Sequence, residues 1–122
     1  MLAIPNIPNK DRAEIIVNTL IHKFGGEDKY LCASFDPDSD RFNPRKYWRG
    51  PVWINLNWLL YVGLKAYGYA NEAHRVKEDS IELIERYGFY EYFDARKNQK
   101  DGGYGGNNFS WSAALLIDML KR

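Results

Sequence analysis

The chain has 122 residues, of which 45% are hydrophobic and 16% aromatic, and its formal net charge at pH 7 is +1. This composition predicts one domain with a sizeable core and excludes a disordered chain. A charge so close to zero argues against nucleic acid or an anionic membrane as the main partner. Cys32 is the single cysteine, and no apolar run is long enough for a signal peptide or a membrane span. We therefore expect a protein of the reducing cytoplasm.

The first part of the chain predicts an irregular arm followed by an amphipathic helix. Ile4 and Ile7 could pin the arm to a neighbouring segment. Asn9 or Asp11 can cap a helix that continues to about Phe24. The apolar face of this helix is expected to consist of Ile15, Ile16, Leu20 and Phe24.

A long connection follows, over residues 27–49, and structureless loops beyond roughly 12–15 residues are usually functional. Its acidic run at residues 36–40 raises the question of calcium. An EF-hand loop starting at Asp36 requires glycine at its sixth position and glutamate at its twelfth, where this chain has Arg41 and Tyr47. We expect no metal here, because the turn chemistry of Asp, Pro and Ser explains the run equally well.

The stretch Tyr47–Trp58, YWRGPVWINLNW, leads from this connection into a second helix. Gly50 allows a sharp entry, and Pro51 suits the first helical position because it lacks an N–H that the helix would leave unpaired. The helix is expected to run from about Trp53 to a left-handed cap at Gly68. Its sequence is apolar nearly all the way round, which is typical of a helix with neighbours on several sides.

Two observations on this stretch concern polar groups. Asn55 and Asn57 need partners inside the protein, because an unpaired buried amide costs about 1–3 kcal/mol. Trp48 and Arg49, at the mouth of the helix, would suit a sugar pocket, since aromatic faces stack on sugar C–H surfaces and a guanidinium grips hydroxyls or a carboxylate. An ordinary core helix with two satisfied asparagines is the alternative.

The remaining helices complete an all-α prediction. A third, amphipathic helix is expected from an Asn71 cap to Tyr87, and a fourth, mostly apolar helix from Ser110 to about Leu120. No segment shows convincing strand alternation. Amphipathic and apolar helices alternate, as in two concentric rings, with both long loops at the same end. Four helices cannot close a double ring, so the architecture predicts part of something larger.

The second long connection runs from Phe89 to about Asn108. It places two acids among aromatics, at Glu91 and Asp94, and then becomes rich in glycine over residues 102–106. No Gly-Lys-Ser/Thr follows the glycines and no strand precedes them, which excludes a nucleotide-binding loop. We expect no cofactor.

The runs YWRGPVWINLNW, GFYEYFD and GGNNFSWSAALL, together and in this order, resemble the end of a glycoside hydrolase catalytic domain. The family is that of the inverting (α/α)6-barrel enzymes, with processing α-glucosidase I (mannosyl-oligosaccharide glucosidase) and mannosylglycerate hydrolase, and distantly trehalase. The first helix and the run Ser34-Phe35-Asp36 extend the resemblance over nearly the whole chain. It implies helical hairpins forming part of an (α/α)6 toroid, about four main helices with two long functional loops. Residues 1–122 would be a single domain, the C-terminal segment of the barrel.

The resemblance also implies inverting hydrolysis, in which an acid protonates the glycosidic oxygen and a base activates water about 6.5–9.5 Å away. The position of the family's base falls on Glu91, whose ionised form a nearby Arg49 would favour. Asp94 could contact a hydroxyl, orient the loop or cap a turn. The residues expected to bind an α-glucoside or α-mannoside are Tyr47, Trp48, Arg49, Trp53, Tyr92 and Trp111.

This chain departs from the family in one respect, because no residue matches the motif that carries the general acid. It is therefore expected to supply the base and part of the sugar pocket, in a homo-oligomer or with a complementing chain, and to hydrolyse poorly alone. One alternative is a non-catalytic carbohydrate-binding or scaffold module with the same fold. The other is an unrelated helical bundle in which the motifs occur by coincidence.

Overall fold

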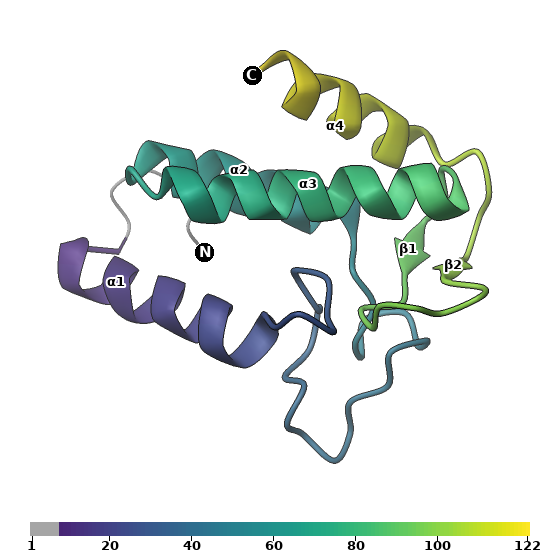
Figure 1. Cartoon of the computed structure of the whole chain (residues 1–122), viewed down its shortest axis with the longest axis horizontal. Coiled ribbons are helices and arrows are strands. Elements are labelled where there is room, and N and C mark those ends of the chain that lie inside the picture. The colour runs from purple at the N-terminus through teal and green to yellow at the C-terminus, as the bar shows by residue number, and fades with distance from the viewer. Residues whose placement is uncertain (1–7) are drawn as a thin grey trace.

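The computed structural model describes residues 8–122, so Ile4 and Ile7 lie outside the described residues. The described part is mostly helical, with two long loops (Figure 1). Its α-helices are α1 (Lys10–Thr19), α2 (Ile54–Ala66), α3 (Ala70–Tyr87) and α4 (Ser110–Lys121). None of these helices combines the length and the apolar character that crossing a membrane demands.

The first helix begins and ends where the sequence predicts. Asn9 caps α1 by accepting the N–H of Arg12 on its side-chain oxygen at 2.9 Å. Helical structure continues to Phe24 as a π-helical turn, Leu20–Phe24. The predicted apolar face is wrong at one position, because Ile15 is 65% exposed. Nothing within residues 8–122 covers that side of α1.

The second helix begins within one residue of the predicted Trp53, but Pro51 does not hold its first position. Pro51 is not its first residue, because the chain is extended at Val52, which exchanges backbone hydrogen bonds of 2.8 and 2.9 Å with Phe93 and also bridges to Ala33. The helix starts at Ile54, after this pairing ends. Its predicted cap is confirmed, since Gly68 has a φ of 83°, in the left-handed region that favours glycine.

The third helix begins at Ala70, one residue before the predicted cap. Tyr69 holds the capping position, and Asn71 lies inside the first turn, so Asn71 does not cap the helix. The helix is amphipathic as expected and packs along α2, with α4 lying across the same pair (Figure 1). The buried side chains of α3 are Ala73, Val76, Asp79, Ser80, Leu83 and Ile84.

A mostly apolar sequence predicts that α4 is buried, but this prediction is wrong for most of the helix. Only Ser112 and Met119 are buried, whereas Trp111, Ile117 and Leu120 are each more than half exposed. Within the described residues, the helices that α4 packs on are chiefly α2 and α3, and the face that carries Trp111, Ile117 and Leu120 is exposed. A strongly apolar sequence therefore leaves apolar surface in contact with solvent.

The expectation of no strands is wrong in one short region. Tyr92–Phe93 (β1) and Gly103–Tyr104 (β2) form an antiparallel pair, with Tyr92 opposite Tyr104. Two-residue strands are too short for a period-two pattern to show in the sequence. This pair lies within the second loop, whereas the bridges Lys29–Arg96 and Val52–Phe93 join that loop to the first one. The two long loops therefore meet at the same end, as the ring arrangement predicted.

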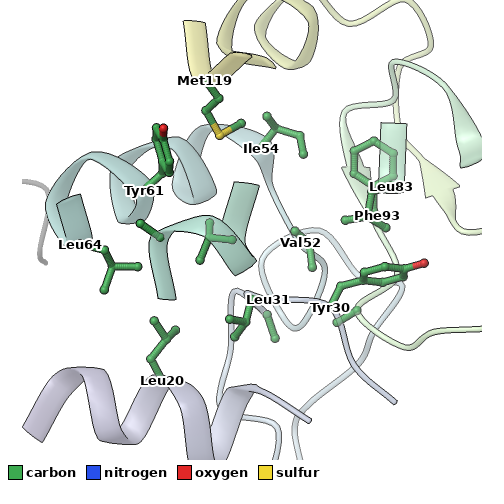
Figure 2. Close-up of a cluster of buried hydrophobic side chains, with 14 of the residues drawn as sticks. Leu20, Tyr30, Leu31, Val52, Ile54, Tyr61, Leu64, Leu83, Phe93 and Met119 are labelled. Atoms are coloured by element: carbon green, nitrogen blue, oxygen red, sulfur yellow. The ribbon is translucent and has the colours of Figure 1, made fainter. Parts of the chain in front are cut away.

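The core lies between α1, α2, α3 and the loop before α2. In Figure 2, Leu20 points from the π-helical turn after α1 towards Leu31 and Leu64, and Met119 points from α4 towards Ile54. The fully buried Asn57 has the partners that the sequence required: its amide donates to Leu31 O and Ser80 Oγ, both at 2.9 Å, and its oxygen accepts the Cys32 N–H at 3.0 Å.

Candidate functional site

Four aromatic side chains from the two long loops form one cluster, made of Tyr47, Trp48, Trp53 and Tyr92. Trp53 is stacked between Trp48, with ring centroids 3.9 Å apart, and Tyr92, at 5.1 Å. Tyr47 packs edge-on against the other three rings at 4.9–5.6 Å, and its carbonyl accepts the Trp53 indole N–H at 2.9 Å. Such aromatic pairs stabilise a fold by about 0.5–1.5 kcal/mol each beyond the burial of their surface, so we expect the cluster to be rigid.

The members of this aromatic cluster differ in exposure. Tyr47 and Trp48 are 52% and 42% exposed, whereas Trp53 is 2% exposed. Trp48 and Tyr47 can therefore present surface to a ligand, while Trp53 lies behind them as support. Burial, followed by the neighbouring charge of Glu91, raises the pKa of Tyr92 above its ordinary value.

A cavity of about 500 Å³ opens against this cluster. Its lining residues are Arg45, Lys46, Tyr47, Trp48, Arg49 and Tyr92. The volume is within the range of small-molecule sites, roughly 300–1,000 Å³. The wall combines three cations with three aromatic rings, which suits a polar ligand that carries apolar C–H faces.

Arg49 does not make the contact with Glu91 that the sequence suggested. Its guanidinium donates two hydrogen bonds to the backbone carbonyl of Arg41, at 3.1 and 3.2 Å. No ion pair joins Arg49 to Glu91 within residues 8–122. Arg49 thus links two parts of its own loop by hydrogen bonds, and it also lines the cavity.

Asp94 is buried, with 1% exposure, and organises the second loop. Its carboxylate accepts the backbone N–H of Arg96 at 2.9 Å and two guanidinium bonds from the same residue at 2.9 and 3.1 Å. The Nε atom of Arg45, a residue that lines the cavity, lies 3.7 Å from Asp94 Oδ2. Of the roles left open by the sequence, the geometry supports capping of the turn and orientation of the loop. The hydrogen bond with Asp94 raises the pKa of Arg96.

Glu91 lies beside the aromatic cluster and is paired with the glycine-rich segment. Its backbone N–H donates to Gly106 O at 3.0 Å, and its Oε2 accepts the Gly106 N–H at 3.1 Å. A Cβ on Gly105 would stand 2.6 Å from Glu91 Oε2 and 2.8 Å from Tyr92 Cε1. Glu91 Oε2 and Tyr92 Cε1 therefore both lie close to Gly105, and Tyr92 is one of the rings that line the cavity.

Trp111 lies apart from the other candidate residues. It is 57% exposed at the start of α4, and its ring packs edge-on against Phe109 at 5.5 Å. No aromatic contact within residues 8–122 joins it to the aromatic cluster. The structure thus brings together five of the six expected binding residues, with Trp53 as support, and leaves Trp111 outside.

The acidic run at residues 36–40 has a structural explanation. Asp36 pairs with Lys23 at 2.8 Å, and its other oxygen accepts the N–H of Asp38 at 2.9 Å. The hydrogen bond from Lys23 is the main reason that the pKa of Asp36 is lowered. Within the described range, no three His, Cys, Asp or Glu side chains are grouped to hold a metal ion.

Arg45 was not identified from the sequence as a residue that lines the cavity, nor were Gly105 and Gly106 identified as the residues that contact Glu91. Gly105 and Gly106 follow Glu91 by 14 and 15 residues, in a run that was considered above only as a nucleotide-binding loop. A glycine run after an acidic motif also permits close backbone approach to that acid. That signal could have identified the pairing.

Comparison with known proteins agrees with the sequence resemblance. Residues 2–112 match the family described as the mannosylglycerate hydrolase MGH1-like glycoside hydrolase domain. The chain is 46% identical over 110 residues to a mannosylglycerate hydrolase of Thermus thermophilus, covering 90% of this chain and 26% of that protein. It is 37% identical over 114 residues to the mannosylglycerate hydrolase MGH1 of Selaginella moellendorffii, covering 93% and 22%.

Solved structures show the same relationship. The crystal structure of a GH63 mannosylglycerate hydrolase from Thermus thermophilus with Tris superposes with a TM-score of 0.85 at 44% identity, over 94% of this chain and 27% of that chain. The complex of that enzyme with glucose gives a TM-score of 0.83 at 43% identity, over 94% and 28%. The chain spans about a quarter of the length of these relatives. Its helical hairpins form part of an (α/α)-barrel, and the chain belongs to the MGH1-like family of GH63 glycoside hydrolases.

Proposed function

We propose that residues 1–122 are a single domain, the C-terminal segment of an inverting glycosidase barrel, which supplies the general base and part of the sugar pocket. The observation that carries this proposal is that the Glu91 carboxylate and the ring of Tyr92 both lie against Gly105, and that Tyr92 lines the 500 Å³ cavity. A carboxylate next to a cavity lined by aromatic rings is what base-assisted hydrolysis of a glycoside requires.

In this mechanism the Glu91 carboxylate takes a proton from a water molecule as the water oxygen bonds to the anomeric carbon. The glycosidic C–O bond breaks on the opposite face of the sugar, and the leaving oxygen takes a proton from a general acid. Acid or base assistance contributes typically 10²–10⁴-fold. No residue of this chain is assigned as the acid, so the chain alone is expected to release little or no sugar.

The substrate we propose is an α-mannoside or α-glucoside. Relatives bear the names mannosylglycerate hydrolase and glucosylglycerate hydrolase, the latter from Mycolicibacterium hassiacum at 33% identity over 90 residues. The exposed surfaces of Trp48 and Tyr47 would stack on the sugar, and the cations on the same wall would donate hydrogen bonds to its hydroxyls or to a carboxylate. We also propose that the protein works in the cytoplasm, as a homo-oligomer or with a complementing chain that carries the acid.

A second candidate is a carbohydrate-binding module without hydrolytic function. The specific observation in its favour is that the aromatic cluster and the cavity are formed entirely by residues of this chain. Sugar binding would then survive replacement of Glu91 by glutamine.

The two candidates are separated by a chimera in which this chain replaces the matched quarter of the Thermus thermophilus mannosylglycerate hydrolase. Hydrolysis of mannosylglycerate by the chimera, and a 10²–10⁴-fold lower rate with Glu91→Gln, are expected for a general base. Glu85→Gln, at an exposed position of α3, is the matched control and should keep the rate. A chimera in which Glu91→Gln hydrolyses at the unsubstituted rate would contradict the proposal. A folded, sugar-binding but inactive chimera would favour the second candidate.

A further inference from the structure

We propose that the main chain at Gly105–Gly106 positions the Glu91 carboxylate, holding Oε2 so that Oε1 is left for the attacking water. This inference rests on the proposed function, because it assigns the glycine-rich segment a part in the work of the base. Gly105 and Gly106 would be positioning residues, which act through Glu91 without touching substrate.

The first support is the reciprocal pairing of Glu91 with Gly106. The Glu91 N–H donates to Gly106 O at 3.0 Å, and the Gly106 N–H donates to Glu91 Oε2 at 3.1 Å. Backbone and side chain of one residue are thus tied to a single glycine. A bond from a backbone N–H to an ionised carboxylate is stronger than one between neutral groups, and it restricts rotation of the carboxylate.

The second support is the contact at Gly105. Its φ is 74°, and a Cβ there would meet Glu91 Oε2 at 2.6 Å and Glu91 Cβ at 2.8 Å. Glycine is required at this position on both grounds, because other residues disfavour the backbone conformation and their side chains would displace Glu91. The absence of a side chain at Gly105 lets the peptide reach the carboxylate.

The third support is that the segment carrying Glu91 is anchored on both sides by the same stretch of chain. Before Glu91, Phe109 N–H donates to Phe89 O at 2.8 Å, and the buried Ser112 hydroxyl donates to Tyr90 O at 2.7 Å. After it, Tyr92 pairs with Tyr104 across the two short strands. The Glu91 backbone is therefore fixed, and the bond from Gly106 then fixes its side chain.

The two carboxylate oxygens end up in different situations. Oε2 accepts the Gly106 N–H, whereas within the described part of the chain no hydrogen bond is made to Oε1. An ionised carboxylate oxygen without a partner can accept a proton from water. Holding one oxygen so that the other is presented in one direction is the pre-organisation that raises rates in positioned reactions.

The test is an NMR titration of the whole chain, following the Gly106 amide proton from pH 3 to pH 7. In the unsubstituted chain this resonance should move as Glu91 ionises, and in Glu91→Gln it should stay constant. Gly105→Ala should abolish the movement by displacing the carboxylate. Gly68→Ala is the matched control, because Gly68 has a similar φ of 83° but no atom within 4 Å of an added Cβ, and it should retain the movement.

If Gly105→Ala does not fold, Glu91→Asp provides the second variant, since its shorter side chain should no longer reach the Gly106 N–H. A Gly106 resonance that does not follow Glu91, or that follows it equally in Gly105→Ala and Gly68→Ala, would overturn the inference. In the chimera, Gly105→Ala should lower kcat by up to about 10²-fold and leave KM nearly unchanged, while Gly68→Ala keeps kcat. The proposed function fails separately, through an unchanged rate in Glu91→Gln, whatever the titration shows.

Discussion

Asn57 illustrates how one polar residue ties the loop before α2 to the helices. It sits in α2 with 0% exposure, and its three hydrogen bonds reach Leu31, Cys32 and Ser80. A buried amide is tolerated only when its donors and acceptor are satisfied. The requirement for partners could be read from the sequence, but their identity could not, because Leu31 and Ser80 are 26 and 23 residues away.

Replacing Asn57 by alanine should therefore destabilise the fold. The variant leaves the Leu31 carbonyl and the Cys32 N–H buried without partners, at a cost of about 1–3 kcal/mol in the free energy of unfolding. Asn55→Ala is the control in the same helix, because the Asn55 side chain is half-buried and bonds only to the neighbouring Leu56 N–H at 3.0 Å. Urea denaturation of both variants measures the difference, and equal losses would contradict this account.

At the scale of elements, the start of α4 is fastened to the segment that carries Glu91. Ser112, in the first turn of α4, is 1% exposed and donates to the carbonyl of Tyr90. The Phe109 N–H donates to Phe89 O just before the helix begins. These two hydrogen bonds hold the start of the second loop against the start of α4, so we expect the loop to lose stability when they are removed.

Ser112→Ala should lower the free energy of unfolding by about 1–3 kcal/mol, because the Tyr90 carbonyl loses its donor. It should also speed amide hydrogen exchange at Glu91 and Tyr92 more than in α3. Ser110→Ala, at the exposed first residue of the same helix, serves as the control and should change little. Uniformly faster exchange over the whole chain in Ser112→Ala would show general destabilisation instead of a local tie.

Over the whole molecule, the prominent surface feature is an apolar stripe on α4. Trp111, Ala114, Ile117 and Leu120 recur every three residues along its exposed face. Ile15 on α1 is exposed as well, at 65%. Large exposed apolar patches mark surfaces that bind other protein chains.

The chain is therefore expected to associate at micromolar concentration, by itself or with a complementing chain. Light scattering after size exclusion should give a mass above 14.3 kDa, the mass of one chain. Ile117→Glu should shift the distribution towards the monomer by placing a charge in the stripe, whereas Lys121→Glu, on the same helix, should not. A monomer at micromolar concentration in the unsubstituted chain would refute this expectation.

The family, the number and order of the helices, and the need for partners at Asn57 could all be predicted from the amino-acid sequence. Helix periodicity, the Asn9 cap and the Gly68 stop are local signals, carried by residues a few positions apart. The three motifs likewise indicated the MGH1-like relationship, and they placed Tyr47, Trp48 and Tyr92 in one candidate site. The comparisons confirm the family, and the structure brings these three rings together.

Which distant segments contact one another could not be predicted and is seen only in the folded chain. Val52 pairs with Phe93, so Pro51 and Val52 are not part of α2. The guanidinium of Arg49 donates to a backbone carbonyl of its own loop, and the N–H of Gly106 donates to Glu91. Each of these contacts joins groups whose local sequence is compatible with several partners. The choice among them depends on the packing of the helices around a shared core, and that is a property of the folded chain as a whole.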